Sequence, residues 1–165
     1  MTTLTPYDLR READALRLIQ GFWLEHNGYQ QTVEEAKADL LAWTGVGHRL
    51  YFIDQEDTTV GVLHLGSRGG EADWLEDIFV LPEYQGRGIG SQAVRLAETI
   101  VKQYSVSMYI EAAARNERAI RLYHRLGFDC LNSITVRKDF PSYHYDVVRT
   151  EQMYELDLEI RKDRE

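Results

Sequence analysis

A glycine-rich loop is the part of the chain whose residue types and spacing most clearly indicate chemistry. It occupies residues 85–91, with glycine at positions 86, 88 and 90 and Arg87 between the first two. Glycine lets backbone N–H groups approach a ligand because it has no Cβ. A helix is predicted to begin at position 88, and a helix start favours an anion through its unpaired N–H groups and about half a positive charge. Because an arginine adds a charged hydrogen bond to phosphate, the loop predicts a phosphate-binding site.

The glycine spacing distinguishes three kinds of phosphate-binding loop. A Walker loop requires Gly-Lys followed by Ser or Thr, which the chain lacks. A dinucleotide fingerprint requires G-x-G-x-x-G, whereas the chain has G-x-G-x-G followed by Ser91. Glu111 lies about 20 residues further on, where the dinucleotide fold places its ribose-binding acid, but the loop comes mid-chain after a predicted hairpin. The third pattern, Q/R-x-x-G-x-G/A, is matched by Gln85, Gly88 and Gly90.

Apolar periodicity, capping residues and turn residues predict the elements that position this loop. Helices are expected over residues 8–25, 33–43, 88–104 and 116–126, and the second follows a capping box formed by Thr32 and Glu35. Strands are expected over residues 2–7, 49–54, 59–65, 73–80, 107–113, 128–136 and 153–158. The chain is therefore predicted to be one α+β domain over residues 1–165, with a mixed, mostly antiparallel central sheet of about seven strands flanked by about four helices.

A second motif follows the loop after one predicted strand. It runs Asn116-Glu-Arg-Ala119-Ile-Arg-Leu-Tyr123-His-Arg-Leu-Gly127-Phe128. This segment resembles the Asn-x-x-Ala-x-x-x-Tyr-x-x-x-Gly-Phe signature of the GNAT superfamily of N-acetyltransferases, and the glycine loop resembles that superfamily's Q/R-x-x-G-x-G/A motif. The resemblance extends over most of the chain. It implies the acyl-CoA N-acyltransferase fold, with acetyl-CoA as a co-substrate.

The resemblance also implies which residues hold the acetyl donor. In this family the strand before the loop carries a bulge and diverges from the next parallel strand, which leaves backbone groups free. By similarity, the backbone of Ile78, Phe79 and Val80 would hold the pantetheine arm like an added strand, and the N–H of Val80 would polarise the thioester carbonyl. Asn116 would contact the cofactor, cap its own helix, or do both. The residues expected at the pyrophosphate are Gln85, Gly86, Arg87, Gly88, Ile89, Gly90 and Ser91.

Direct transfer of an acetyl group to an amine benefits from a proton donor for the departing thiolate. The similarity to the family assigns this role to Tyr123. A phenol has a pKa of about 10 and keeps its proton at neutral pH. The same tyrosine would also fit the apolar face of its predicted helix, as an ordinary core residue.

The reaction also needs a base, and two carboxylates compete for that role. Glu76 stands in a Leu-Glu-Asp-Ile-Phe-Val run similar to that of diamine acetyltransferases. Glu111 lies on the next predicted strand, where ribosomal-protein N-terminal acetyltransferases place theirs. Strand alternation puts Glu76 on the same face as Val80, so Glu76 is the preferred base, acting directly or through water. For both residues the alternative is a surface carboxylate beside a cation.

Charge narrows the range of partners. The chain has 19 basic and 27 acidic side chains, a net charge of −8. This charge opposes attraction to nucleic acid or to an anionic membrane and suits a cationic substrate. We therefore expect acetylation of a primary amine on a small cationic molecule, such as a polyamine or an aminoglycoside, without a nucleic-acid or membrane partner. The alternatives are a protein N-terminal or lysine acetyltransferase and a CoA-binding module without turnover; a homodimer is compatible with each.

The cysteine and histidine content bears on location and metals. Cys130 is the only cysteine, so no internal disulfide can form and a cytoplasmic location is expected. No apolar run approaches the roughly 20 residues that span a bilayer. The five histidines show no metal-binding spacing, so no metal is expected in the reaction.

Overall fold

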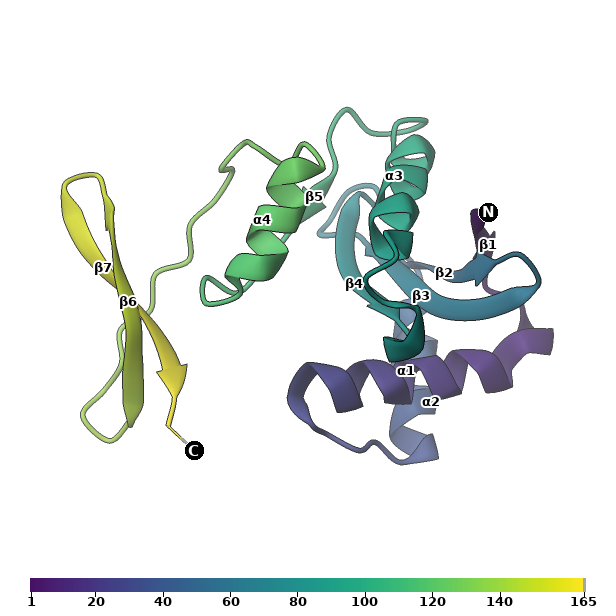
Figure 1. The fold of residues 1–165 in the computed structure, drawn as a ribbon, viewed down its shortest axis with the longest axis horizontal. Coiled ribbons are helices and arrows are strands. Elements are labelled where there is room, and N and C mark those ends of the chain that lie inside the picture. Colours follow the sequence, from purple (N-terminus) through teal and green to yellow (C-terminus); the bar gives the residue numbers. More distant parts are fainter. Residues whose placement is uncertain (165) are drawn as a thin grey trace. The chain divides into compact units, whose positions relative to one another are not determined.

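The computed structural model describes residues 1–164. They fall into two compact units, Met1–Glu111 (unit 1) and Ala112–Glu165 (unit 2, described to Arg164), and each unit is described by itself (Figure 1). Helices and a mixed sheet occur together, so the predicted α+β class is confirmed.

Unit 1 is built on a five-stranded sheet whose strands lie in chain order. The strands are β1 (Thr2–Pro6), β2 (Arg49–Gln55), β3 (Thr58–Gly66), β4 (Trp74–Val80) and β5 (Tyr109–Ile110). The first four pair antiparallel, and β5 pairs with β4 in parallel. The predicted hairpin over residues 49–65 is confirmed, and its turn contains Glu56 with a φ of +56°.

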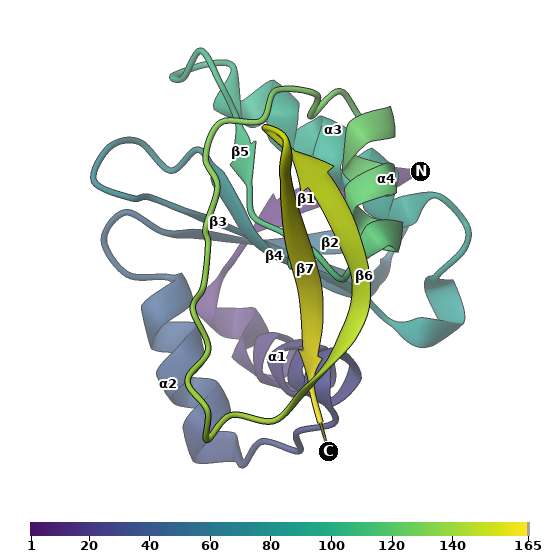
Figure 2. The ribbon, with the colours of Figure 1, turned by 90° about the vertical axis from the view of Figure 1, so that its left-hand side faces the viewer.

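Helices flank this sheet. A short 3₁₀ helix (Leu9–Arg11) leads into α1 (Glu12–Asn27), so the first predicted helix begins in 3₁₀ form. Next comes α2 (Val33–Trp43), which starts with the predicted capping box. The two helices lie side by side (Figure 2). The glycine loop leads into α3 (Ile89–Val101).

The main hydrophobic core lies between α1, α2 and one face of the sheet. Its members include Leu18, Ile19, Leu40, Phe52, Val62 and Phe79. Side chains alternate between the two faces along a strand, so Val80 points to the opposite face, on the side of α3. There its Cγ2 lies 3.9 Å from the position that a Cβ on Gly90 would occupy. Strand β4 is therefore packed on both faces just before the glycine loop.

Unit 2 contains α4 (Glu117–Arg125) and a hairpin of β6 (Tyr145–Met153) and β7 (Leu156–Asp163). The hairpin turns at Tyr154 and Glu155, whose φ angles are +54° and +62°. Two successive positive φ angles match the turn geometry that suits the right-handed twist of a hairpin.

Three predicted strands differ from the structure. The strand expected over residues 107–113 shortens to the two residues of β5, and residues 128–136 form no strand. The range 153–158, expected as one strand, instead contains the end of β6 at Met153, the turn at residues 154–155 and the start of β7 over residues 156–158. The seven strands therefore form a five-stranded and a two-stranded sheet. The hairpin escaped prediction because its turn has no glycine, asparagine or proline, and β6 mixes charged and apolar residues without alternation.

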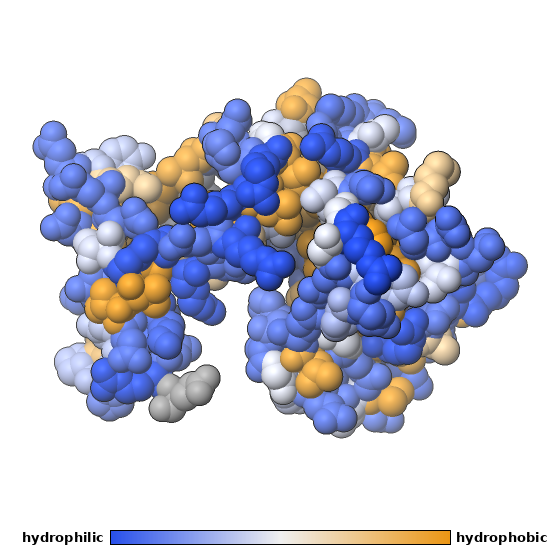
Figure 3. Space-filling view, in the orientation of Figure 1, coloured by the Kyte–Doolittle hydropathy of each residue, from blue (hydrophilic) through white to orange (hydrophobic). Residues whose placement is uncertain are grey.

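The face drawn in Figure 3 is mostly polar, in keeping with a core that contains large apolar side chains. Its apolar side chains lie in small separate patches. Within residues 1–164, no helix combines the length and the apolar character that a membrane crossing requires.

Candidate functional site

The glycine loop presents a row of backbone N–H groups that have no partner. After β4, a 3₁₀ helix (Pro82–Tyr84) leads into the loop, and α3 follows Gly88 without a side-chain cap. The first backbone bond of the helix runs from the N–H of Gln92 to the carbonyl of Gly88, at 3.0 Å. Among residues 1–164, the N–H groups of residues 86–91 find no acceptor. A helix start with this many free donors favours an anion beside it.

Two glycines give the loop its shape. Gly86 and Gly88 have φ angles of +73° and +77°, a region that residues with a Cβ rarely adopt. A Cβ added to either residue would meet no protein atom within 4 Å. The space beside the loop is therefore open, which fits the pyrophosphate of coenzyme A that the sequence predicts there.

Gln85 anchors the loop. Its Nε2 donates to the carbonyl of Val80 at 2.8 Å and to Oε1 of Glu25 at 2.7 Å. The sequence predicts a cofactor-binding role for Gln85, and in the structure its amide ties the loop to β4 and α1. The contact between Gln85 and Glu25 joins residues that are 60 positions apart in the chain, so no local sequence pattern predicts it. Arg87 lies over the ring of Tyr84, 5.4 Å from its centroid.

Within unit 1, strand β4 has an open edge at residues 76–80, beside the loop. The parallel pairing with β5 covers only Trp74 with Tyr109 and Leu75 with Ile110, so residues 76–80 have no strand partner on this side within unit 1. On the other side, the N–H of Leu81 donates to the carbonyl of Val60 at 2.8 Å.

The pattern of hydrogen bonds between β3 and β4 determines which backbone groups of β4 face the open edge. Because hydrogen-bonded pairs alternate with non-bonded pairs, Val80, opposite Gly61, turns its N–H and carbonyl away from β3. Gln85 occupies the carbonyl. The N–H faces the open edge.

The predicted bulge is also present, and it changes the position of Glu76. Asp77 pairs with His64 and Leu75 pairs with Leu65, so Glu76 is the extra residue. A Cβ on Gly66 would lie 2.7 Å from Cγ of Glu76, which places this side chain on the face of Gly66 and His64. Simple alternation had placed Glu76 on the face of Val80. That expectation was wrong because the bulge shifts the alternation by one residue.

One arginine holds both candidate bases. Arg68 Nη2 lies 3.2 Å from Oε2 of Glu76, and its Nη1 lies 2.8 Å from Oε2 of Glu111. The hydrogen bonds to Glu76 and then Glu111 raise the pKa of Arg68 above its usual value. The guanidinium also lies over the ring of Trp74, 3.6 Å from its centroid. Of the two carboxylates, Glu76 is 25% exposed and Glu111 is 66% exposed. The role of Arg68 had no sequence signal, because it stands in a turn between strands.

The remaining predicted residues lie in unit 2. Asn116 is the N-cap of α4, and its Oδ1 accepts from the N–H of Ala119 at 3.1 Å, which confirms the predicted cap. Gly127 has a φ of +102°, as expected beyond the end of a helix. Tyr123 packs edge to face with Phe128, and burial raises the pKa of its phenol. The phenol therefore keeps its proton at neutral pH, as a proton donor must.

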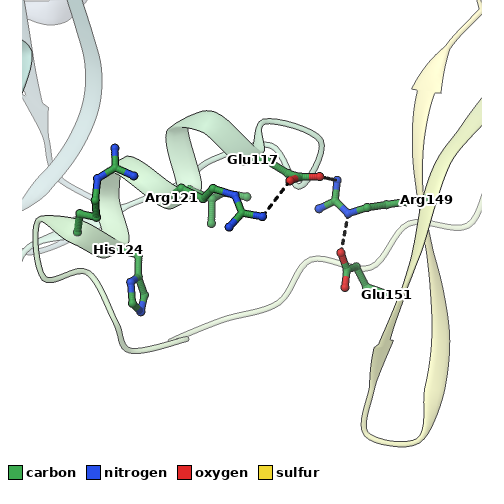
Figure 4. Close-up of a pocket in the computed structure, with 7 residues that line it drawn as sticks. Glu117, Arg121, His124, Arg149 and Glu151 are labelled. Carbon is green, nitrogen blue, oxygen red and sulfur yellow. Dashed lines mark hydrogen bonds and ion pairs between the residues drawn. The ribbon is translucent and has the colours of Figure 1, made fainter.

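Unit 2 also contains a pocket between α4 and β6 (Figure 4). Its volume is about 440 Å³, and its lining is Glu117, Ile120, Arg121, His124, Arg125, Arg149 and Glu151. Arg149 bridges Glu117, at 2.7 Å, and Glu151, and Arg121 lies 3.4 Å from Glu117. Most of its charged groups thus pair with one another, and none of the predicted site residues lines it.

Two acetyltransferases are similar in sequence to part of this chain. Thialysine N-epsilon-acetyltransferase from Bos taurus is 39% identical over 59 residues, which cover 35% of this chain and 35% of that protein. Spermidine N(1)-acetyltransferase from Escherichia coli K12 is 38% identical over 55 residues, which cover 31% and 28%. The chain thus spans about a third of the length of these two curated relatives.

A solved structure shows the same fold. The aminoglycoside antibiotic 6'-N-acetyltransferase from Acinetobacter baumannii superposes with a TM-score of 0.63 at 20% identity, covering 85% of this chain and 99% of that one. The model of the acetyltransferase (GNAT) family matches residues 15–128, a segment that includes β4, the glycine loop, α3 and α4. Since this match covers most of the chain, the protein belongs to the acetyltransferase (GNAT) family.

Proposed function

We propose that this protein transfers an acetyl group from acetyl-CoA directly to a primary amine of a small cationic molecule. The observation that carries the proposal is the row of free N–H groups over residues 86–91, next to the open edge of β4. The relatives named for thialysine and spermidine support a small amine as acceptor, as does the net charge of −8. We take residues 1–165 as one catalytic domain acting in the cytoplasm.

The donor side of the proposed site is made of backbone. The N–H groups of residues 86–91 and the guanidinium of Arg87 would bind the pyrophosphate. Residues 78–80 of the open edge would hold the pantetheine arm through backbone hydrogen bonds. The N–H of Val80 would donate to the thioester carbonyl and favour the charge that develops on its oxygen. Acetyl-CoA itself supplies an activated acetyl group.

The acceptor side supplies charge and proton transfer. An ammonium group has no lone pair, so it must lose a proton before it attacks. Glu76 would bind the ammonium and take this proton, with Glu111 as the competing base. Tyr123 would give its phenolic proton to the departing thiolate. Arg68 would hold both carboxylates in place.

Binding of the donor is the first test. We expect Gly88→Ala to weaken coenzyme A binding by roughly tenfold or more, because its Cβ enters the space beside the N–H groups and strains a φ of +77°. Gly28→Ala is a matched control, since Gly28 also has a positive φ (+72°) and open space, at the end of α1. Calorimetry with coenzyme A measures both variants. Equal affinities for the two variants would contradict the proposal that the N–H groups of residues 86–91 bind the pyrophosphate.

Turnover is the second part of that test. Thiol release from acetyl-CoA is measured across a panel of polyamines, aminoglycosides, lysine analogues and peptides. Release with a small amine supports the proposal. Thiol release only with peptides would show a protein acetyltransferase. Coenzyme A binding without thiol release would show a CoA-binding module without turnover. A thermal shift with NAD or ATP, but not with coenzyme A, would show a nucleotide-binding domain instead.

The two carboxylates are separated by matched substitutions. We expect Glu76→Gln to lower turnover by roughly 100-fold and to remove the acidic limb of the pH–rate profile, since the base is lost. Glu111→Gln should retain that limb, although it too loses an ion pair with Arg68. Profiles of kcat/KM for the two variants measure the difference. The reverse result would make Glu111 the base.

A further inference from the structure

The guanidinium of Arg68 lies on a surface of unit 1 that suits a cation. Its Nε and Nη2 donate to Glu76 at 3.4 Å and 3.2 Å, and its Nη1 donates to Glu111 at 2.8 Å. All three guanidinium nitrogens therefore contact a carboxylate. The guanidinium also lies 3.6 Å from the centroid of the Trp74 ring, well within the range over which an aromatic face attracts a cation.

The sheet brings these partners together. Trp74 of β4 pairs with Tyr109 of β5, and their rings stack with centroids 5.0 Å apart. Glu76 and Glu111 each stand two residues further along their strands, beyond the last pair of this parallel ladder. Gly66, whose face Glu76 shares because of the bulge, pairs directly with Trp74. The carboxylate of Glu76 and the indole therefore lie on the same face of the sheet.

The backbone of Arg68 belongs to a turn that is held by its own hydrogen bonds. Oγ of Ser67 donates to the carbonyl of Gly70 at 2.6 Å and accepts from the N–H of Gly70 at 3.1 Å. The side chain of Arg68 is 42% exposed and takes no part in these bonds. A neutral side chain at this position therefore leaves both the turn and the core in place.

Other polar groups on this face pair among themselves. Nδ1 of His64 lies 2.8 Å from Oδ2 of Asp77, and Nε2 of His64 lies 2.8 Å from Nδ1 of His48. Asp77 thus has a partner of its own. The charged groups that meet beside the indole are one guanidinium and two carboxylates. Together they leave one negative charge, which a single ammonium group neutralises.

We propose that Arg68 is a specificity-determining residue, because its guanidinium fills the place that a second cationic group of the acceptor would take. This inference rests on the proposed function, in which Glu76 binds the reacting ammonium. A second ammonium on a short acceptor would have to displace the guanidinium or lie close to its like charge. A neutral group at that point of the acceptor meets neither cost. The protein therefore prefers acceptors that carry one ammonium group.

A matched pair of acceptors tests this preference. A short linear diamine is compared with the amino alcohol of the same length, in which a neutral hydroxyl replaces the second ammonium. In the wild-type chain, kcat/KM for the diamine should be no higher than for the amino alcohol. Arg68→Met removes the charge and keeps an unbranched side chain. It should shift the ratio of the two kcat/KM values toward the diamine by roughly tenfold or more, since the indole and two carboxylates become open to the second ammonium.

A control variant separates this effect from a change in net charge. Arg10→Met removes the same charge from unit 1, at an exposed ion pair with Asp8, and should leave the ratio as in the wild-type chain. A wild-type preference for the diamine would overturn the proposal. So would an unchanged ratio in Arg68→Met, because Arg68 would then only position the carboxylates.

Binding of a free cation keeps this inference separate from the proposed function. Methylguanidinium matches the head of the arginine side chain, and its binding is followed through the NMR signal of the Trp74 indole N–H. It should bind Arg68→Met at least roughly tenfold more tightly than it binds the wild-type chain or Arg10→Met. If no amine is acetylated, the proposed function fails, and this titration still decides the inference. Equal binding to all three chains shows that Arg68 does not fill a cation site.

Discussion

Replacing Tyr123 with phenylalanine should lower turnover by at least roughly 100-fold while coenzyme A binds as in the wild-type chain. The substitution removes only the O–H, and general acid catalysis by a positioned group contributes at least about that much. The ring remains packed edge to face on Phe128, so the fold is preserved. Because burial raises the pKa of the Tyr123 phenol, the group stays protonated at neutral pH and can act as a donor.

Thiol release measures turnover in this variant, and calorimetry measures coenzyme A binding. Tyr143→Phe is the matched control, since Tyr143 is another partly buried tyrosine of unit 2 and stacks on Tyr145. It should keep full turnover. If Tyr123→Phe also turned over at the wild-type rate, Tyr123 would be a packing residue and another group would protonate the thiolate.

The second large effect is expected for Gly61→Ala, which should lower the free energy of unfolding by about 3 kcal/mol or more. A Cβ at this position would lie 2.1 Å from the carbonyl oxygen of Phe79 and 3.1 Å from Cα of Val80. Both are backbone atoms of β4, so the clash is relieved only by moving the strand. Because that strand carries the Val80 N–H, coenzyme A binding should weaken as well.

Urea denaturation measures this loss of stability. Gly70→Ala is the control, because a Cβ there meets nothing within 4 Å and its φ is not in the left-handed region. It should change the free energy of unfolding by less than about 0.5 kcal/mol. An unchanged urea midpoint for Gly61→Ala would mean that β3 and β4 can separate at this point without cost.

The parts of the site that depend on local chemistry could be predicted from sequence. The glycine spacing over residues 85–91, the capping box at Thr32 and the cap at Asn116 each depend on a few neighbouring residues. The hairpin turn at Tyr154 and Glu155 is local as well, but it was missed because non-glycine residues seldom adopt positive φ.

The parts that depend on pairing between distant segments could not be predicted. The position of Glu76 is set by a bulge, which exists only relative to β3. Arg68 joins two carboxylates that stand eight and 43 residues further along the chain. The contact between His48 and His64 likewise requires β2 and β3 to be placed side by side. Local sequence patterns do not record contacts between distant segments. The family resemblance therefore identified the candidate bases but not the residues that surround them.

The open edge of β4 also bears on whether this strand can pair with another chain. A strand edge with free N–H and carbonyl groups is a template for pairing with another chain, and proteins protect such edges with charge or by covering them. Here the edge carries the carboxylates of Glu76 and Asp77 at its start, and Gln85 occupies the carbonyl of Val80 at its end. Between them, Ile78 carries no charge, and no strand of unit 1 covers its backbone groups on this side. A donor bound along residues 78–80, as proposed above, would pair with these backbone groups and protect the edge.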